Sequence, residues 1–180
     1  MRDKVFVDTN ILVDAHDRST GRKHDRANEL LQKIWEAGNG VISTQVLQEL
    51  CVSLRKKAVQ PLSIIELRRL IQDYLCWEVI VNTADATIEA LDLESCFRIS
   101  FWDARILQAS ETAGAAVVYS EDLSNGQKFG SVRVENPLVE QTNLHPQLHD
   151  RCSSSSLILR RLGHRRYVWV LLQVLAQRLP

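Results

Sequence analysis

The sequence predicts an α/β fold in which helices cover both faces of a central, mostly parallel sheet. Short apolar runs of strand length alternate along the chain with longer segments whose apolar residues recur at helical spacing. The first run, residues 5–7, contains no polar residue, which is typical of a strand buried on both faces. Strands separated by helices form parallel sheets between helical layers, so we expect a three-layer α/β/α sandwich.

The expected elements follow one another in regular order from the N-terminus. Helical periodicity predicts helices over residues 11–15, 24–37, 45–57, 63–74, 84–96 and 101–113. Apolar runs predict strands over residues 5–7, 41–43, 77–81, 115–119 and 132–134. Ser63 and Ser100 stand at capping distance before acids in their helices, and Thr44 is placed to cap the helix that follows it.

We expect residues 1–140 to form one folded domain, and residues 141–180 differ from them in composition. The tail contains four consecutive serines, then arginines, then an apolar segment. It holds six arginines and one acid, a net charge of +5, whereas residues 1–140 hold 16 basic and 21 acidic residues, a net charge of −5. We expect a poorly specified appendage here; a basic amphipathic helix that binds a partner is the alternative.

Composition and charge exclude some classes of protein. The chain is 45% apolar and 24% charged, as in ordinary globular proteins. Its acidic body lacks the basic surface that binds nucleic acid by charge alone, so a polyanionic substrate requires a metal or a basic partner. The N-terminus has no apolar signal core, and the apolar stretch at residues 167–175 is too short to span a bilayer. We therefore expect a cytoplasmic protein without a membrane partner.

Four carboxylates stand where a parallel sheet would bring them together. Asp8 ends the first strand, and Glu49 lies early in the helix after the second strand. Asp103 lies in the first turn of its helix, and Asp122 follows the strand that ends at Tyr119. The carboxyl ends of parallel strands share one edge, where α/β proteins bind ligands. Carboxylate oxygens suit Mg²⁺ or Mn²⁺, which can activate water and offset charge on a phosphodiester.

Each acid also has a purely structural explanation. Ser100 and Asp103 have the spacing of a helix cap, and an acid there also suits the helix dipole. Glu49 can be a solvated helix acid, and Asp122 lies in a turn-like run. Only Asp8, directly after an apolar strand, indicates function by itself, because burying an isolated charge is unfavourable.

Three further residues have two interpretations each. Asn10 can orient a water or a ligand carboxylate, or it can make a local turn bond. Ser120 can contact metal-bound water, or it can cap a loop. We expect Trp102 to belong to the core rather than to stack on bases.

The acidic motifs resemble those of PIN-domain nucleases, above all the VapC-type toxins of bacterial type II toxin–antitoxin systems. The matching stretches are Val7-Asp8-Thr9-Asn10, Gln48-Glu49-Leu50, Phe101-Trp102-Asp103-Ala104 and Ser120-Glu121-Asp122-Leu123. The resemblance covers about residues 1–140. It implies an α/β/α fold, Mg²⁺- or Mn²⁺-dependent endoribonuclease activity on RNA, a homodimer, and a small antitoxin that inhibits the active site. It also implies catalytic and metal-binding roles for four acids, with the first and third as the foremost direct ligands: Asp8, Glu49, Asp103 and Asp122.

The sequence fits other function classes less well than a ribonuclease. The main alternative is a catalytically impaired PIN-like protein that only captures an antitoxin. A phosphoacceptor signalling module needs a pocket lysine after a late strand, but the strand over residues 115–119 is followed by acids. A phosphatase with an Asp-x-Asp nucleophile is disfavoured because Asn10 occupies the second position.

Overall fold

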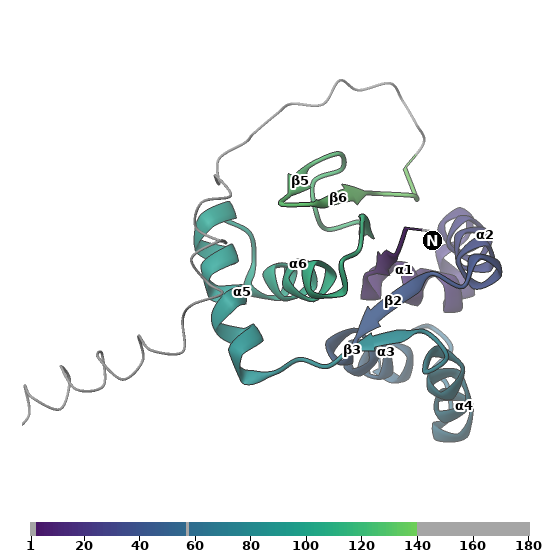
Figure 1. The fold of residues 1–180 in the computed structure, drawn as a ribbon. Coiled ribbons are helices and arrows are strands. Elements are labelled where there is room, and N and C mark those ends of the chain that lie inside the picture. Colours follow the sequence, from purple (N-terminus) through teal and green to yellow (C-terminus); the bar gives the residue numbers. More distant parts are fainter. Residues whose placement is uncertain (1–2, 57, 140–180) are drawn as a thin grey trace, which may run out of the picture. The chain divides into compact units, whose positions relative to one another are not determined.

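A computed structural model describes residues 3–56 and 58–139 of the chain (Figure 1). Within this range one six-stranded sheet has the order β3-β2-β1-β4-β6-β5. The strands are β1 (Val5–Val7), β2 (Gly40–Ser43), β3 (Glu78–Ile80), β4 (Val117–Tyr119), β5 (Lys128–Phe129) and β6 (Val132–Glu135). Neighbouring strands are parallel except in the β5–β6 hairpin. The predicted mostly parallel sheet is confirmed.

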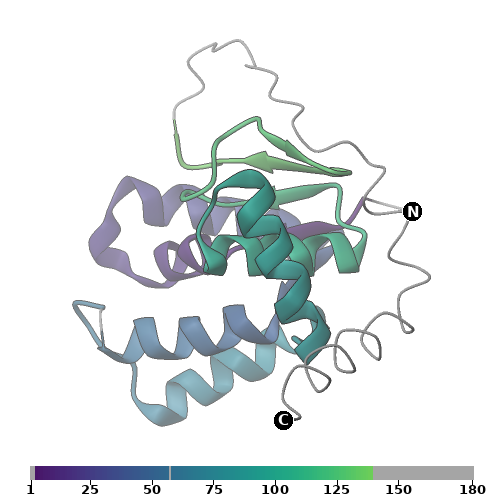
Figure 2. The same ribbon diagram turned by 90° about the vertical axis from the view of Figure 1, so that its left-hand side faces the viewer.

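Helices complete the sandwich. They are α1 (Thr9–His16), the 3₁₀-helix η1 (Arg18–Thr20), α2 (Arg22–Ala37), α3 (Thr44–Lys56), α4 (Ile64–Tyr74), α5 (Ala84–Phe97) and α6 (Phe101–Ala113). Figure 1 shows α5 and α6 on one side of the sheet and α1 and α2 on the other. Figure 2 shows α3 and α4 lying side by side. The three-layer α/β/α fold is thereby confirmed, whereas the tail predicted over residues 141–180 lies outside the described residues.

Two predicted helix caps are confirmed. Ser63 and Glu66 form a full capping box at the start of α4, because each side chain accepts from the other residue's backbone N–H. At the start of α6, Ser100 Oγ accepts from the backbone N–H of Asp103 at 3.1 Å. Both caps satisfy N–H groups that have no partner within the helix.

The predicted cap at Thr44 is wrong. Ser43 Oγ accepts from the backbone N–H of Val46 at 3.3 Å and so caps α3 one residue earlier. The Thr44 hydroxyl instead accepts from the backbone N–H of Asn82, just after β3, at 3.2 Å. The sequence alone does not show which of these two hydroxyls caps α3. The contact between Thr44 and Asn82, which follow the neighbouring strands β2 and β3, leaves Ser43 as the cap.

Strand β1 lies in the interior of the sheet, between β2 and β4. Phe6 and Val7 are fully buried, as expected for a strand covered on both faces. The backbone N–H of Asp8 donates to the carbonyl of Tyr119 at 3.0 Å, so the ends of β1 and β4 are aligned. The residues that follow these two strands therefore emerge side by side.

Gly40 begins β2 directly against the ring of Trp77. A Cβ atom at residue 40 would lie 2.5 Å from Trp77 Cδ2, well inside van der Waals contact. We expect Gly40→Ala to lower the free energy of unfolding by about 1–3 kcal/mol, as measured by urea denaturation. In a Trp77→Leu background, where the smaller side chain leaves room, the same change should be nearly neutral. Equal losses in both backgrounds would contradict this packing.

Candidate active site

Asp8 ends β1 and caps α1, and it is almost completely buried, with 6% of its surface exposed. Its Oδ1 accepts from the backbone N–H of Thr9 at 2.6 Å, and its Oδ2 accepts from Ser120 Oγ at 2.7 Å. Burial raises the pKa of Asp8 from its ordinary 3.8 to about 7, although both hydrogen bonds oppose that rise. The charges of Asp122 and Glu49 also raise the pKa of Asp8.

Asn10 connects two of these carboxylates. Its Nδ2 donates to Asp122 Oδ2 at 3.0 Å and to Asp8 Oδ2 at 3.3 Å. The same nitrogen lies 3.4 Å from Ser120 Oγ. One oxygen of each carboxylate therefore faces the same electropositive amide group. A cation could interact with the two oxygens in the same way.

The β4–β5 loop, residues 120–127, is held against the first two helices. Ser120 Oγ accepts from the backbone N–H of Asp122 at 3.2 Å, and Asn10 Oδ1 accepts from that of Glu121 at 3.4 Å. The Glu121 carboxylate forms an ion pair with Lys23 Nζ at 2.7 Å. These contacts fix the direction in which the loop presents Asp122.

Glu49 reaches the same edge from α3, which begins where β2 ends. Thr9 Oγ1 donates to Glu49 Oε2 at 2.7 Å. Gln45 Nε2 donates to Glu49 Oε1 at 3.0 Å, across one turn of the helix. Both carboxylate oxygens are therefore held, one by the residue that follows Asp8 and one by the helix itself.

Asp103 lies in the first turn of α6, where its Oδ2 accepts from Ser100 Oγ at 2.8 Å. Because α6 leads into β4, its N-terminus lies at the carboxyl edge of the sheet. The carbonyl of Trp102 accepts from Gln45 Nε2 at 3.4 Å, so this turn contacts the helix that carries Glu49. Among the described residues, Asn10 contacts both Asp8 and Asp122, and no hydrogen bond joins Asp103 to Asp8, Glu49 or Asp122.

The expectation that Trp102 belongs to the core is wrong. Its side chain is 61% exposed and packs edge-on against Phe101, with ring centroids 5.5 Å apart. The first turn of a helix at the edge of a sheet has fewer neighbours than a turn over the sheet. An apolar ring therefore lies open beside Asp103.

Three residues of this region were missed by the sequence analysis: Thr9, Lys23 and Gln45. For Gln45 a signal exists, because Gln45 and Glu49 have the i, i+4 spacing of interacting side chains on a helix. Thr9 directly follows the strand end, but its hydroxyl has no partner that the sequence alone identifies. The pairing of Lys23 with Glu121 has no signal in the sequence, since it depends on how α2 packs beside the β4–β5 loop.

The carboxylates fit a hard divalent cation. No Lys, Arg or His of the described residues forms an ion pair with Asp8, so its buried charge has no basic partner there. In residues 3–56 and 58–139, no group of three or more His, Cys, Asp and Glu side chains is arranged to hold a metal ion. Mg²⁺ does not require such a cage, because it commonly binds one or two carboxylates and keeps several waters. Asp8 and Asp122, which face one point, satisfy that requirement.

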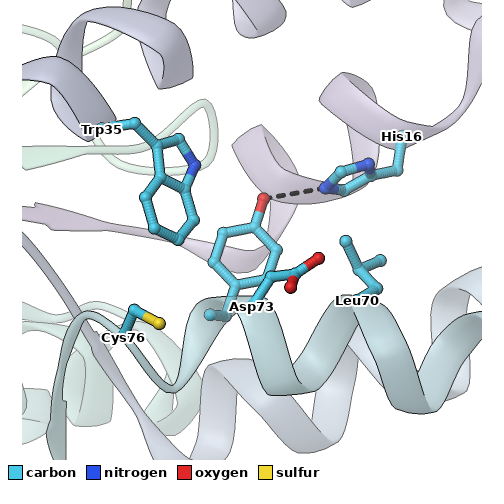
Figure 3. A pocket seen from close by; sticks show the side chains of 6 residues that line it. His16, Trp35, Leu70, Asp73 and Cys76 are labelled. Carbon is cyan, nitrogen blue, oxygen red and sulfur yellow. Dashed lines mark hydrogen bonds between the residues drawn. The ribbon is translucent and has the colours of Figure 1, made fainter.

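A separate pocket of about 400 Å³ opens between α1, α2 and α4 (Figure 3). His16 Nε2 lies 2.8 Å from the Tyr74 hydroxyl across it. Burial lowers the pKa of His16 and raises that of Tyr74, so both groups are uncharged at neutral pH. None of the pocket residues is one of the four acids, and nothing in the pocket supplies a carboxylate pair.

Three solved structures share the fold of this chain. A toxin–antitoxin complex from Klebsiella pneumoniae is 20% identical, with a TM-score of 0.55, and covers 74% of this chain and 98% of that chain. VapC20 of Mycobacterium tuberculosis, described as a sarcin-ricin loop cleaving toxin, is 20% identical, with a TM-score of 0.53 and coverage of 66% and 90%. DNA-bound VapBC from Salmonella typhimurium is 18% identical, with a TM-score of 0.51 and coverage of 76% and 99%. At these identities the similarity is one of fold.

Comparison with curated proteins gives no match. The family defined by the PIN domain matches residues 5–124, which is more than half of the chain and includes all four acids. No helix within the described residues is long and apolar enough to cross a membrane. The fold, the strand-end carboxylates and this match agree, and the chain belongs to the PIN-domain family.

Proposed function

We propose that this chain is a Mg²⁺- or Mn²⁺-dependent endoribonuclease and the toxin of a toxin–antitoxin pair. One observation carries the proposal. The buried Asp8 is connected through Asn10 to Asp122, and the adjacent Thr9 is bonded to Glu49, all at the carboxyl edge of a PIN fold. Such an arrangement places negative charge where an α/β sheet binds its ligands.

The proposed metal ligands are Asp8, Asp103, Glu49 and Asp122, each of which also counts as catalytic. A bound divalent cation lowers the pKa of water and offsets the charge that develops on a phosphodiester. Ser120 and the backbone of Thr9 fix both oxygens of Asp8, and Asn10 orients Asp122 toward it. These residues preorganise the carboxylates before a substrate arrives.

RNA is the proposed substrate. The exposed ring of Trp102, beside Asp103, is available to stack on an unpaired base, and such stacking contributes about 1–3 kcal/mol per base. Lys23, held by Glu121 next to Asp122, supplies a positive charge on an otherwise acidic rim. Together these groups suit single-stranded RNA whose bases are exposed.

A small antitoxin is the proposed protein partner, and a homodimer is the proposed assembly. The names of the similar structures from Klebsiella pneumoniae and Salmonella typhimurium describe a toxin–antitoxin complex and a VapBC assembly. The alternative, an impaired protein that only captures an antitoxin, is less well supported. Decay would leave the site residues free to drift, whereas Asp8, Glu49 and Asp122 all keep defined partners.

Metal removal provides the test of this function. With Mn²⁺ present, the purified chain should cut total RNA at reproducible positions, found by mapping the new RNA ends. Excess EDTA should stop cleavage, and added Mn²⁺ should restore it. Cleavage that continues unchanged in EDTA, or the same RNA ends with and without the chain, would refute a metal-dependent ribonuclease.

A further inference from the structure

We propose that Gln45 is a positioning residue that fixes Glu49 and the first turn of α6 for catalysis. The proposal rests on the ribonuclease function proposed above and adds to it a residue that lies outside the four acids. Gln45 is buried, with 3% of its surface exposed, on the first turn of α3. A buried amide is unfavourable unless its donors and its acceptor are hydrogen-bonded.

Every polar atom of the Gln45 side chain has a partner. Its Nε2 donates to Glu49 Oε1 at 3.0 Å and to the carbonyl of Trp102 at 3.4 Å. Its Oε1 accepts from Arg105 Nε at 3.3 Å. One side chain thereby joins the helix that carries Glu49 to the first turn of the helix that carries Asp103.

The partners admit only one orientation of the amide. A guanidinium can only donate, and a carbonyl or an ionised carboxylate can only accept. Rotating the amide by half a turn would set its oxygen against Glu49 and Trp102 and its nitrogen against Arg105. The three hydrogen bonds to Glu49, Trp102 and Arg105 therefore all require the same orientation of the Gln45 amide.

Arg105 is itself held in place. Its guanidinium donates to Thr87 Oγ1 on α5 at 2.9 Å and lies 5.9 Å from the centroid of the Phe101 ring. The network therefore runs from α5 through α6 to α3. With Thr9 Oγ1 bonded to the other oxygen of Glu49, both sides of that carboxylate are defined.

The chain contains a matched control for a buried glutamine. Gln108 is 7% exposed, and its Nε2 donates to Glu89 Oε2 and to Thr112 Oγ1, each at 2.9 Å. Neither partner is one of the four acids. A loss of stability from removing a buried amide should appear at both glutamines, whereas an effect on the site should appear only at Gln45.

The test compares Gln45→Met with Gln108→Met. Mn²⁺ binding is measured without RNA by electron paramagnetic resonance, RNA cleavage gives kcat and KM, and urea denaturation gives stability. We expect similar stability losses in both variants. Only Gln45→Met should weaken Mn²⁺ binding, by about 10–100-fold, and lower kcat with little change in the KM for RNA. The proposal would be overturned if Gln45→Met kept the Mn²⁺ binding and kcat of the parent. It would also be overturned if Gln108→Met lost as much Mn²⁺ binding and kcat as Gln45→Met.

A second variant separates donation to Glu49 from simple packing. Gln45→Glu keeps the shape and the acceptor for Arg105 but replaces the donor that faces Glu49. It should fold and should lower kcat as far as Gln45→Met does; a kcat equal to that of the parent would count against positioning.

Failure of the two proposals can be told apart. If the parent cleaves RNA and the Gln45 variants cleave it equally well, only the role of Gln45 is wrong. If the parent does not cleave RNA, the function is wrong, and Mn²⁺ binding alone then decides whether Gln45 orders the carboxylates. If the parent binds no Mn²⁺, both the proposed function and the proposed role of Gln45 are wrong.

Discussion

Asp8→Asn should reduce RNA cleavage by more than about 100-fold while the chain keeps its fold. Mutating a residue that only hydrogen-bonds to a metal ligand typically lowers metal affinity or activity by about 10–100-fold. Asp8 is proposed to bind the metal directly, so its loss should have a larger effect. Asparagine has nearly the same shape and can still accept from Thr9 through its one oxygen, so the strand end should stay in place. The measurement is the initial rate of RNA cleavage at saturating Mn²⁺, with circular dichroism as the check on folding.

Asp73→Asn is the matched control for this prediction. Asp73 is exposed and lines the separate aromatic pocket rather than the carboxylate site. Its substitution removes one negative charge from the same acidic body and should leave the rate within about twofold of the parent. Because both variants are purified identically, the comparison also exposes a contaminating ribonuclease. An Asp8→Asn protein that cleaves as fast as Asp73→Asn would show that Asp8 is not part of the catalytic machinery.

Asp8→Asn should also stabilise the metal-free protein above pH 7. The pKa of Asp8 is raised by burial from 3.8 to about 7, so the folded chain holds the proton more tightly than the unfolded chain. The stability that protonated Asp8 contributes is fully present below pH 3.8, declines as the pH rises, and is gone above about pH 7. The whole change corresponds to roughly 4 kcal/mol, at about 1.4 kcal/mol per pKa unit.

Asparagine is neutral at every pH and avoids this loss, although it gives up part of the hydrogen bonding to Ser120 and Asn10. We expect Asp8→Asn to raise the free energy of unfolding by about 2–4 kcal/mol at pH 8 in EDTA, and to have little effect near pH 4. Urea denaturation at both pH values measures the difference. Mn²⁺ should stabilise the parent at pH 8 more than the variant, because only the parent has the Asp8 carboxylate as a ligand. If the variant were less stable than the parent at pH 8, the buried charge of Asp8 would not destabilise the metal-free fold, and this prediction would be wrong.

The parts of the fold that the sequence predicts are those that depend on local pattern. Apolar periodicity places most helices and strands within a few residues, and the run over residues 5–7 identifies the interior strand. Strand β5, Lys128–Phe129, was missed because two residues cannot show alternation. The caps show the same boundary: Ser63 and Ser100 follow from spacing, whereas the choice between Ser43 and Thr44 depends on a contact with Asn82.

The candidate site divides in a similar way. Asp8 and Ser120 follow directly from the ends of adjacent parallel strands, so the sequence places them at one edge. The bridging amides of Asn10 and Gln45 depend on side-chain directions that are set only by packing between elements. Trp102 was misplaced because an aromatic residue in a helix favours burial, and nothing in the sequence shows that this turn lies at an uncovered edge.

Anomalous scattering from a crystal of the parent chain soaked in Mn²⁺ tests the central claim most directly. The account predicts a manganese peak at the carboxyl edge of the sheet, about 2 Å from a carboxylate oxygen of Asp8 and close to Asp122. A fully soaked crystal with no peak beside Asp8, or with manganese bound only elsewhere, would contradict it.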